Sequence, residues 1–229
     1  MGGQWADRVA IRVVLDRVAE PPEAIAGCTE AFVRAFEARR GRTDWEVIDG
    51  PAWTGSAAEL TEVVRSRPST AATGEADPSD GYGYSLYRRL GPRAAMSVGV
   101  DVGGRFIGRR LPSQNVRANV INPPGVPVEP GLADALLESL IEAWRPLFAN
   151  LSTYDINVLR RRGQWKIPAG YRVWLRDGTV SLTEVADGIT LHPFAGGTMI
   201  RVPDHWAPEE IAARLVETYE RNGVDVVPH

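Results

Sequence analysis

Strict alternation of apolar and polar residues in the middle of the chain is the feature that most restricts its fold. Apolar residues stand at every second position in segments 82–86, 96–102 and 116–120, with small or polar residues between them. Successive side chains of a strand point to opposite faces, so this period predicts strands that are buried on one face only. Half-buried strands are typical of antiparallel rather than parallel sheets. Gly103-Gly104 indicates a turn between two of them.

Further strands are predicted at both ends of the chain. Val9–Leu15 and Trp45–Ile48 are rich in β-branched and aromatic residues, and segment 154–158 has the two-residue period. Ile189–Leu191 and Thr198–Val202 flank Gly196-Gly197, a hairpin signal. The period of segment 171–175 fits either a strand or a helical turn.

Four segments place apolar residues at helical spacing. They run from Pro22 to Gly41, from Ser56 with Glu59 at capping-box spacing, from Gly131 to Ala149, and from Pro208 to Gly223. The third has a broad leucine-rich face, and Pro146 is expected to kink its last turn. The prediction is an α+β fold, a mostly antiparallel sheet packed by three to four amphipathic helices. We expect a single domain over residues 1–229, with a mobile loop at about 67–81, which is rich in Pro, Gly, Ser, Thr and Asp.

Composition limits the function more than it defines it. The formal net charge is -3 and the pI about 5.7, which argues against a nucleic-acid partner. Cys28 is the only cysteine, so an intramolecular disulfide is impossible. The sequence has no apolar run of membrane-spanning length and no signal-peptide pattern at its N-terminus, which favours a cytoplasmic protein without membrane contact.

Candidate chemistry is sparse. No two histidines have the spacing of a helical zinc site, and no phosphate-binding glycine motif is present, so we expect neither metal nor cofactor. Asp204 beside His205 could orient a general base, although a helix cap at Asp204 is the commoner role. Asp101 and Asp155, on the polar sides of predicted strands, could form an acid-base pair. Solvated carboxylates, or bonds to an arginine such as Arg117, are the usual alternative.

Four short sequence motifs, taken in order, carry a resemblance to a known protein family over roughly residues 81–202. They are Asn115-Val116 leading to Asn122-Pro123, Ala143-Trp144-Arg145-Pro146, Gly170-Tyr171-Arg172-Val173-Trp174-Leu175, and Gly196-Gly197-Thr198-Met199-Ile200. In these motifs the chain resembles a bacterial polymorphic-toxin immunity family, immunity protein 52. Tyr171 and Trp174 depart from the aromatic residues of that pattern, and residues 1–80 match it loosely.

The resemblance implies a cytoplasmic protein, without catalytic residues, that binds and neutralises a cognate toxin, a nuclease of restriction-endonuclease type. Because nucleases present basic surfaces, acidic side chains should then speed association, and exposed tryptophans should anchor the contact. The candidates are Glu75, Asp77 and Asp80 on the long loop, Asp101 on the sheet, and Trp53 and Trp174. Two alternatives stay open. One is a small-molecule enzyme that uses Asp101 with Asp155, or Asp204 with His205. The other is a secretion accessory protein that binds without neutralising.

Overall fold

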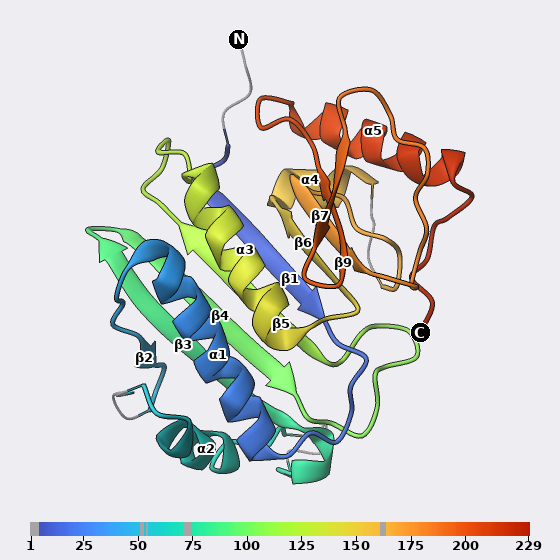
Figure 1. The fold of residues 1–229 in the computed structure, drawn as a ribbon. Coiled ribbons are helices and arrows are strands. Elements are labelled where there is room, and N and C mark those ends of the chain that lie inside the picture. The colour runs from blue at the N-terminus through green and yellow to red at the C-terminus, as the bar shows by residue number, and fades with distance from the viewer. Residues whose placement is uncertain (1–4, 51–52, 54, 71–74, 161–163) are drawn as a thin grey trace.

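The fold is α+β, built on one antiparallel sheet of nine strands in the order β2-β3-β4-β5-β1-β6-β7-β9-β8 (Figure 1). The computed structural model describes residues 5–50, 53, 55–70, 75–160 and 164–229. The strands are β1 (Arg8–Val14), β2 (Glu46–Val47), β3 (Tyr82–Gly91), β4 (Ala94–Val102), β5 (Asn115–Ile121), β6 (Phe148–Ser152), β7 (Arg172–Arg176), β8 (Thr190–Phe194) and β9 (Gly197–Arg201). The helices are α1 (Pro22–Arg40), α2 (Ala57–Arg65), α3 (Pro130–Trp144), α4 (Tyr154–Arg160) and α5 (Pro208–Arg221), with a 3-10 turn, η1, at Pro78–Asp80.

The alternating segments form the middle of this sheet, as their period predicts. Val98 of β4 pairs with Ala118 of β5, which pairs in turn with Ile11 of β1. All three side chains are buried, on the face that α1 and α3 cover. Their neighbours along each strand point to the other face and are half-buried or exposed. Half-burial on one face is therefore confirmed for β4 and β5, and β1 shows a similar alternation.

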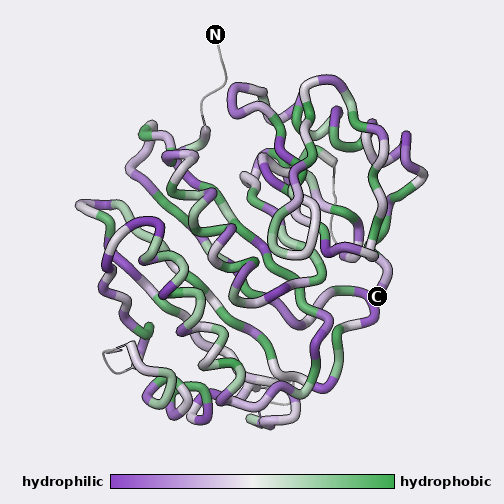
Figure 2. Tube along the Cα trace, in the orientation of Figure 1, coloured by the Kyte–Doolittle hydropathy of each residue, from purple (hydrophilic) through white to green (hydrophobic). Residues whose placement is uncertain are grey.

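Helices α1 and α3 lie side by side over the central strands (Figure 1). Phe32 and Phe36 of α1 and Leu136 and Leu140 of α3 are fully buried. Figure 2 shows hydrophobic residues concentrated in the central strands and in α3, with hydrophilic residues on the outer loops. Burying these side chains is the main stabilising contribution to the fold. Among the described residues, no helix is both long and apolar enough to cross a membrane.

Two predicted elements after the leucine-rich helix are wrong. The helix does not continue to Ala149 but ends at Trp144, where Arg145 takes a left-handed conformation with φ 43°. The residues that follow form β6, whose five side chains are all buried. A strand with two buried faces has no alternating pattern, so its apolar run reads like an extension of the helix.

The second error is the strand predicted at 154–158, which is helix α4. Thr153 begins it by accepting a hydrogen bond from the backbone N–H of Ile156 at 3.4 Å. Ile156 is buried, whereas Tyr154 and Val158 are exposed, and α4 packs against α5. In so short a segment, apolar residues at every second position do not distinguish a strand from a helix.

The stretch with the ambiguous period, 171–175, forms β7, which lies between β6 and β9. The predicted glycine hairpin is confirmed between β8 and β9, and its two glycines have different roles. Gly196 has φ 77° in the turn. Gly197 leaves room for Trp174, because a Cβ there would lie 2.4 Å from the indole ring. The turn therefore requires one glycine and the packing of β7 the other.

Segment 67–81 is tied to the sheet in its described parts. Pro68 forms a bridge with Tyr82, and Thr70 forms one with Ala76. Residues 71–74, at the centre of the predicted mobile loop, lie outside the described residues. The loop ends at Gly81, which has φ 104° and leaves no space for a Cβ beside the carbonyl of Val102.

Candidate partner-binding site

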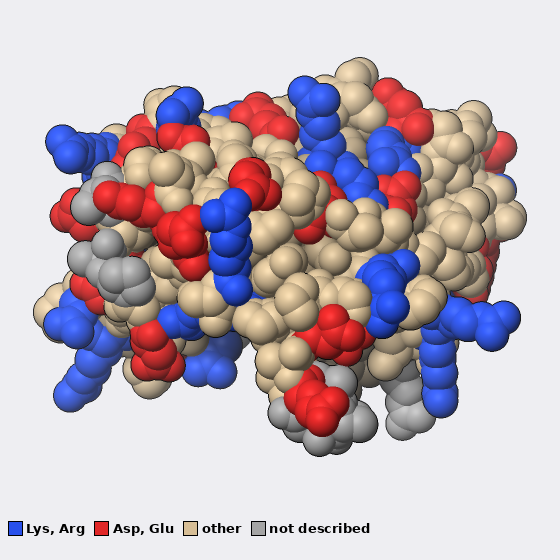
Figure 3. Space-filling model, turned by 90° about the horizontal axis from the view of Figure 1, so that it is seen from below, with Lys and Arg blue, Asp and Glu red and all other residues tan. Residues whose placement is uncertain are grey.

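A groove of about 660 Å³ opens between α1, β2 and the segment that leads to α2. It lies at the α2 side of the molecule, and Figure 3 shows acidic and basic side chains together over this end. Its lining combines aromatic and charged groups. The lining residues are Glu30, Val33, Arg34, Glu37, Arg42, Thr43, Asp44, Trp45, Glu46, Trp53 and Gly55.

Two tryptophans form the apolar part of the groove. Trp45 is buried and makes edge contacts with Phe32 and Phe36, at centroid distances of 5.6 and 6.1 Å. Its indole N–H is buried and has no hydrogen-bond partner among the described residues. An unpaired buried donor costs free energy, but a donor without exposed surface is not available to a ligand in this conformation. Trp53 is half-buried, and its indole N–H donates to the carbonyl of Ser56 at 3.2 Å.

The charged part of the groove is acidic in balance, with four carboxylates against two guanidinium groups. Glu30 pairs with Arg34, and Glu37 accepts bonds from the backbone N–H and hydroxyl of Thr43 at 2.9 and 3.1 Å. Asp44 and Glu46 are exposed and form no ion pair with any described residue. This arrangement can receive a cationic side chain at the two free carboxylates.

The predicted acidic candidates on the long loop have local structural roles. Asp77 begins η1 and accepts a hydrogen bond from the backbone N–H of Ser79 at 2.8 Å. Hydrogen bonds from Ser79 also lower the pKa of the Asp77 carboxyl. Arg105 approaches Asp77 at 3.9 Å and Asp80 at 4.0 Å, which attaches this loop to the one after β4. Glu75 is exposed.

Trp53 is the predicted candidate that lies in the groove, whereas Trp174 is part of the core. Trp174 is 1% exposed, and its indole N–H donates to the carbonyl of Phe194 at 2.8 Å. A side chain with so little surface cannot anchor a partner on this structure. Asp101 is exposed on the sheet, beside a shallow hollow of about 360 Å³.

Asp101 and Asp155, which were candidates for an acid-base pair on the sheet, do not lie on the same sheet face. Asp155 stands in the first turn of α4, so it does not share a strand face with Asp101. Asp204 contacts Arg172 at 2.8 Å, and His205 is exposed. Over the described ranges, no group of three or more His, Cys, Asp or Glu side chains is placed to hold a metal ion.

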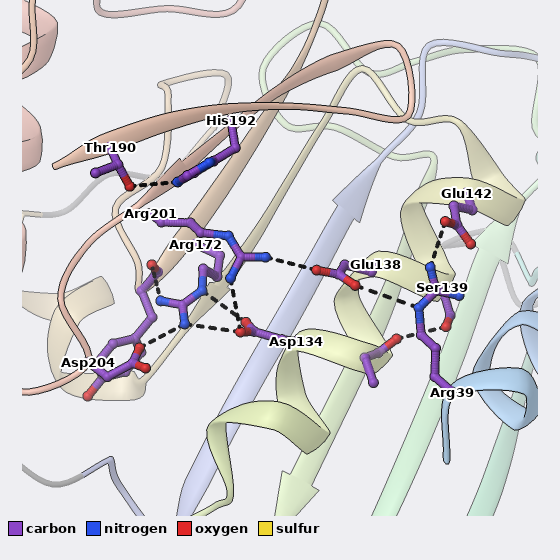
Figure 4. Close-up of polar contacts among 12 residues, drawn as sticks. Arg39, Asp134, Glu138, Ser139, Glu142, Arg172, Thr190, His192, Arg201 and Asp204 are labelled. Carbon is purple, nitrogen blue, oxygen red and sulfur yellow. Dashed lines mark hydrogen bonds and ion pairs between the residues drawn. The ribbon is translucent and has the colours of Figure 1, made fainter. Parts of the chain in front are cut away.

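An ion-pair network joins the helices to the far half of the sheet (Figure 4). Asp134 of α3 contacts Arg172 of β7 at 2.9 Å and Arg201 of β9 at 3.4 Å. The 2.9 Å contact joins Arg172 Nε and Asp134 Oδ1 as an ion pair, and Arg172 Nη2 donates a hydrogen bond to Asp134 Oδ2 at 3.1 Å. Glu138 continues the network from Arg201 to Arg39 of α1. The guanidinium of Arg172 also lies over the ring of Trp5 at 5.5 Å. The network stabilises the packing of α3 on β7 and β9.

Comparison with known proteins finds a distant likeness among solved structures. No family model matches the sequence, and none of the curated proteins matches it. Among solved structures, a Pseudomonas aeruginosa T6SS protein is similar in fold, with a TM-score of 0.49 and 11% sequence identity. The alignment covers 94% of this chain and 75% of that one.

Sequence reasoning missed Asp44 and Glu46, the free carboxylates of the groove. They flank Trp45, the first residue of the predicted strand Trp45–Ile48, and the alternation of acidic residues around a tryptophan was the available signal. Exposed carboxylates on either side of a buried residue share one face of a strand. What the sequence lacked was the position of α1, which forms the opposite wall.

Proposed function

We propose that this chain is an immunity protein that binds and neutralises a secreted bacterial nuclease toxin. The four ordered sequence motifs between residues 115 and 200 support the family, and the acidic, tryptophan-lined groove supports the mode of binding. The groove is the observation that carries the proposal. A nuclease exposes basic side chains where it holds nucleic acid, and a partner of opposite charge can occupy that surface.

In this proposal a lysine or arginine of the toxin enters the groove between Asp44 and Glu46. Trp53, which lines the groove and is half-buried, covers the aliphatic part of the inserted side chain. The partially buried pairs strengthen the complex because the groove excludes much of the water. The complex would block the toxin's access to nucleic acid.

The first experiment is co-expression of the chain with the neighbouring reading frame. Growth rescue together with a stable, purified complex is expected. A complex without rescue would indicate an accessory protein, and rescue without a complex would indicate an enzyme that acts by another route. Absence of both would overturn the proposal.

The second experiment locates the contact with a charge reversal, Asp44→Lys with Glu46→Lys. A double change Asp177→Lys with Asp187→Lys is the matched control, since both residues are exposed acids away from the groove. Association of the groove variant should be slower by about tenfold at low salt, and less sensitive to salt. Equal slowing in both variants would mean that net charge alone matters, and would remove the groove from the interface.

A further inference from the structure

The face of the sheet that points away from α1 and α3 carries a second charged surface. We define the open sheet face by the side chains of β3, β4, β5 and β1 that alternate with the buried ones. Small residues make up much of it. They are Gly83, Ser85, Ala95, Ser97, Gly99 and Ala10. The charged residues of this face are four arginines, Arg8, Arg12, Arg89 and Arg117, and one acid, Asp101. A basic surface thus stands on a chain whose net charge is -3.

Two of these arginines are direct cross-strand neighbours. Arg12 of β1 is opposite Arg117 of β5 in the strand register. Like charges at such positions repel each other. Burial lowers the pKa of Arg12, and the charge of Arg117 lowers it further. Arg12 is half-buried, with its guanidinium 6.0 Å from the ring centroid of Phe148, so it is not free to swing away into solvent.

Neither guanidinium forms an ion pair within the described part of the chain. The ion pairs among the described residues include none of the four arginines of the open sheet face. Asp101 is on the same face, but it does not come within ion-pair distance of Arg117. Asn150 stands opposite Arg12 on the other side, and its side-chain oxygen is buried without a partner. An anion held between Arg12 and Arg117 would relieve their repulsion.

A second cross-strand arginine pair in this chain does form ion pairs with carboxylates. Arg172 and Arg201 are also register partners, on β7 and β9. Carboxylates of Asp134, Glu138 and Asp204 surround that pair. Where an arginine pair serves the fold, this protein supplies the counter-charges itself. The bare pair on the open sheet face therefore points to a counter-charge from outside.

The strand next to Arg117 leaves space for such a group. Gly99 is paired with Arg117, and nothing except ordinary contacts, at 3.4 Å or more, would meet a Cβ there. The arginine side chains therefore project from a surface of small residues that leaves them accessible.

We propose that the open sheet face binds an acidic segment of a protein, with one carboxylate held between Arg12 and Arg117. Planar guanidinium groups suit carboxylates because two N–H donors match two oxygens. A protein fits better than nucleic acid, because the face offers one adjacent guanidinium pair, which matches a single carboxylate, and not the row of cations that would follow a run of phosphates. This site is separate from the groove, and it does not depend on the proposed immunity function.

The test measures binding of a fluorescein-labelled oligoglutamate peptide by anisotropy, with an oligoglutamine peptide and single- and double-stranded DNA as parallel probes. The double variant Arg12→Gln with Arg117→Gln should weaken binding of oligoglutamate by about tenfold or more, the loss that corresponds to about 1.4 kcal/mol. The matched control is Arg109→Gln with Arg110→Gln, an exposed arginine pair in the loop after β4, and it should bind nearly as wild type does.

A second variant tests the shape of the surface without changing its charge. Gly99→Leu keeps both arginines and should fold, because the position has room for a side chain, yet it covers the strand beside Arg117. It should weaken oligoglutamate binding as well, while circular dichroism shows an unchanged fold.

Three results would overturn the proposal. Equal weakening in the control variant would mean nonspecific attraction. Tighter binding of DNA than of oligoglutamate, lost in the same Arg12 and Arg117 variant, would make the face a nucleic-acid surface. Self-association by sedimentation without any probe, again lost in that variant, would make a second copy of this chain the occupant.

Discussion

The two cross-strand arginine pairs, Arg172 with Arg201 and Arg12 with Arg117, differ in whether carboxylates of the protein lie within ion-pair distance. Arg172 and Arg201 lie next to α3, whose Asp134 and Glu138 reach them, and the Arg172 side chain is 5% exposed (Figure 4). Arg12 and Arg117 occupy the same kind of register position but point away from the helices. The first pair is part of the packing between layers. The second pair costs electrostatic energy in the free protein, which is the usual condition of a binding surface.

The largest loss of stability should come from removing Arg172, one of the two arginines that form ion pairs with Asp134. Arg172→Met removes the partner of Asp204 and one of the two partners of Asp134, and it loses the contact with Trp5. A partly buried carboxylate without its counter-charge destabilises a protein by about 3 kcal/mol. Urea unfolding at neutral pH measures the change.

The matched control for this variant is Arg221→Met, which removes a surface ion pair with Glu217. Such pairs contribute little, so the unfolding midpoint should barely move. If Arg172→Met costs no more than that control, the network in Figure 4 is not a stabilising one and the contrast between the pairs disappears.

A smaller effect should follow from giving the bare pair a carboxylate of its own. Gly99→Glu places an acid directly across from Arg117, where a side chain has room. Opposite charges at such positions contribute about 0.5 kcal/mol, so the variant should be more stable than Gly99→Gln, its neutral counterpart. It should also bind oligoglutamate more weakly, because the internal carboxylate competes. A variant less stable than Gly99→Gln would mean that Arg117 is already neutralised.

Removing one charge of the bare pair should change stability less. In Arg117→Gln the repulsion with the directly opposite Arg12 is lost, together with the longer-range attraction to Asp101, so we expect a net gain of at most about 0.3 kcal/mol. Thermal unfolding at low salt is the suitable measurement, with added salt reducing the gain. A clear loss of stability would show that Arg117 supports the fold.

The smallest effect concerns Asp101, whose pKa is raised by burial and partly restored by the charge of Arg117. The Arg117→Gln variant should therefore raise the pKa of Asp101 further, as an NMR titration of its carboxyl would show. A carboxyl with a raised pKa binds its proton more tightly when folded, so its contribution to stability falls as pH rises from the unfolded to the folded pKa. In the variant that fall should extend to higher pH. An unchanged pKa would mean that the two side chains are not electrically coupled.

The sequence predicted more of the fold than of the candidate sites. Alternation identified β4 and β5, and helical spacing identified α1 and α5, because one side of each element is exposed to water. Elements buried on both faces have no such contrast, which is why the predicted helix was extended to Ala149, into the first two residues of β6. Trp174 was misjudged for the same reason, since nothing in its local pattern distinguishes a tryptophan under a glycine hairpin from one at a surface.

The sites depend on contacts between distant segments. Asp44 and Glu46 become part of a groove only because α1 forms the other wall, and Trp53 joins them from the segment before α2. Arg12 and Arg117 are far apart in the sequence and meet through the pairing of β1 with β5. Local periodicity alone determined which residues share a face. Which strands pair, in which register, and which carboxylates reach an arginine were decided by burial of the whole apolar set, because that burial is a property of the packed chain and not of any segment.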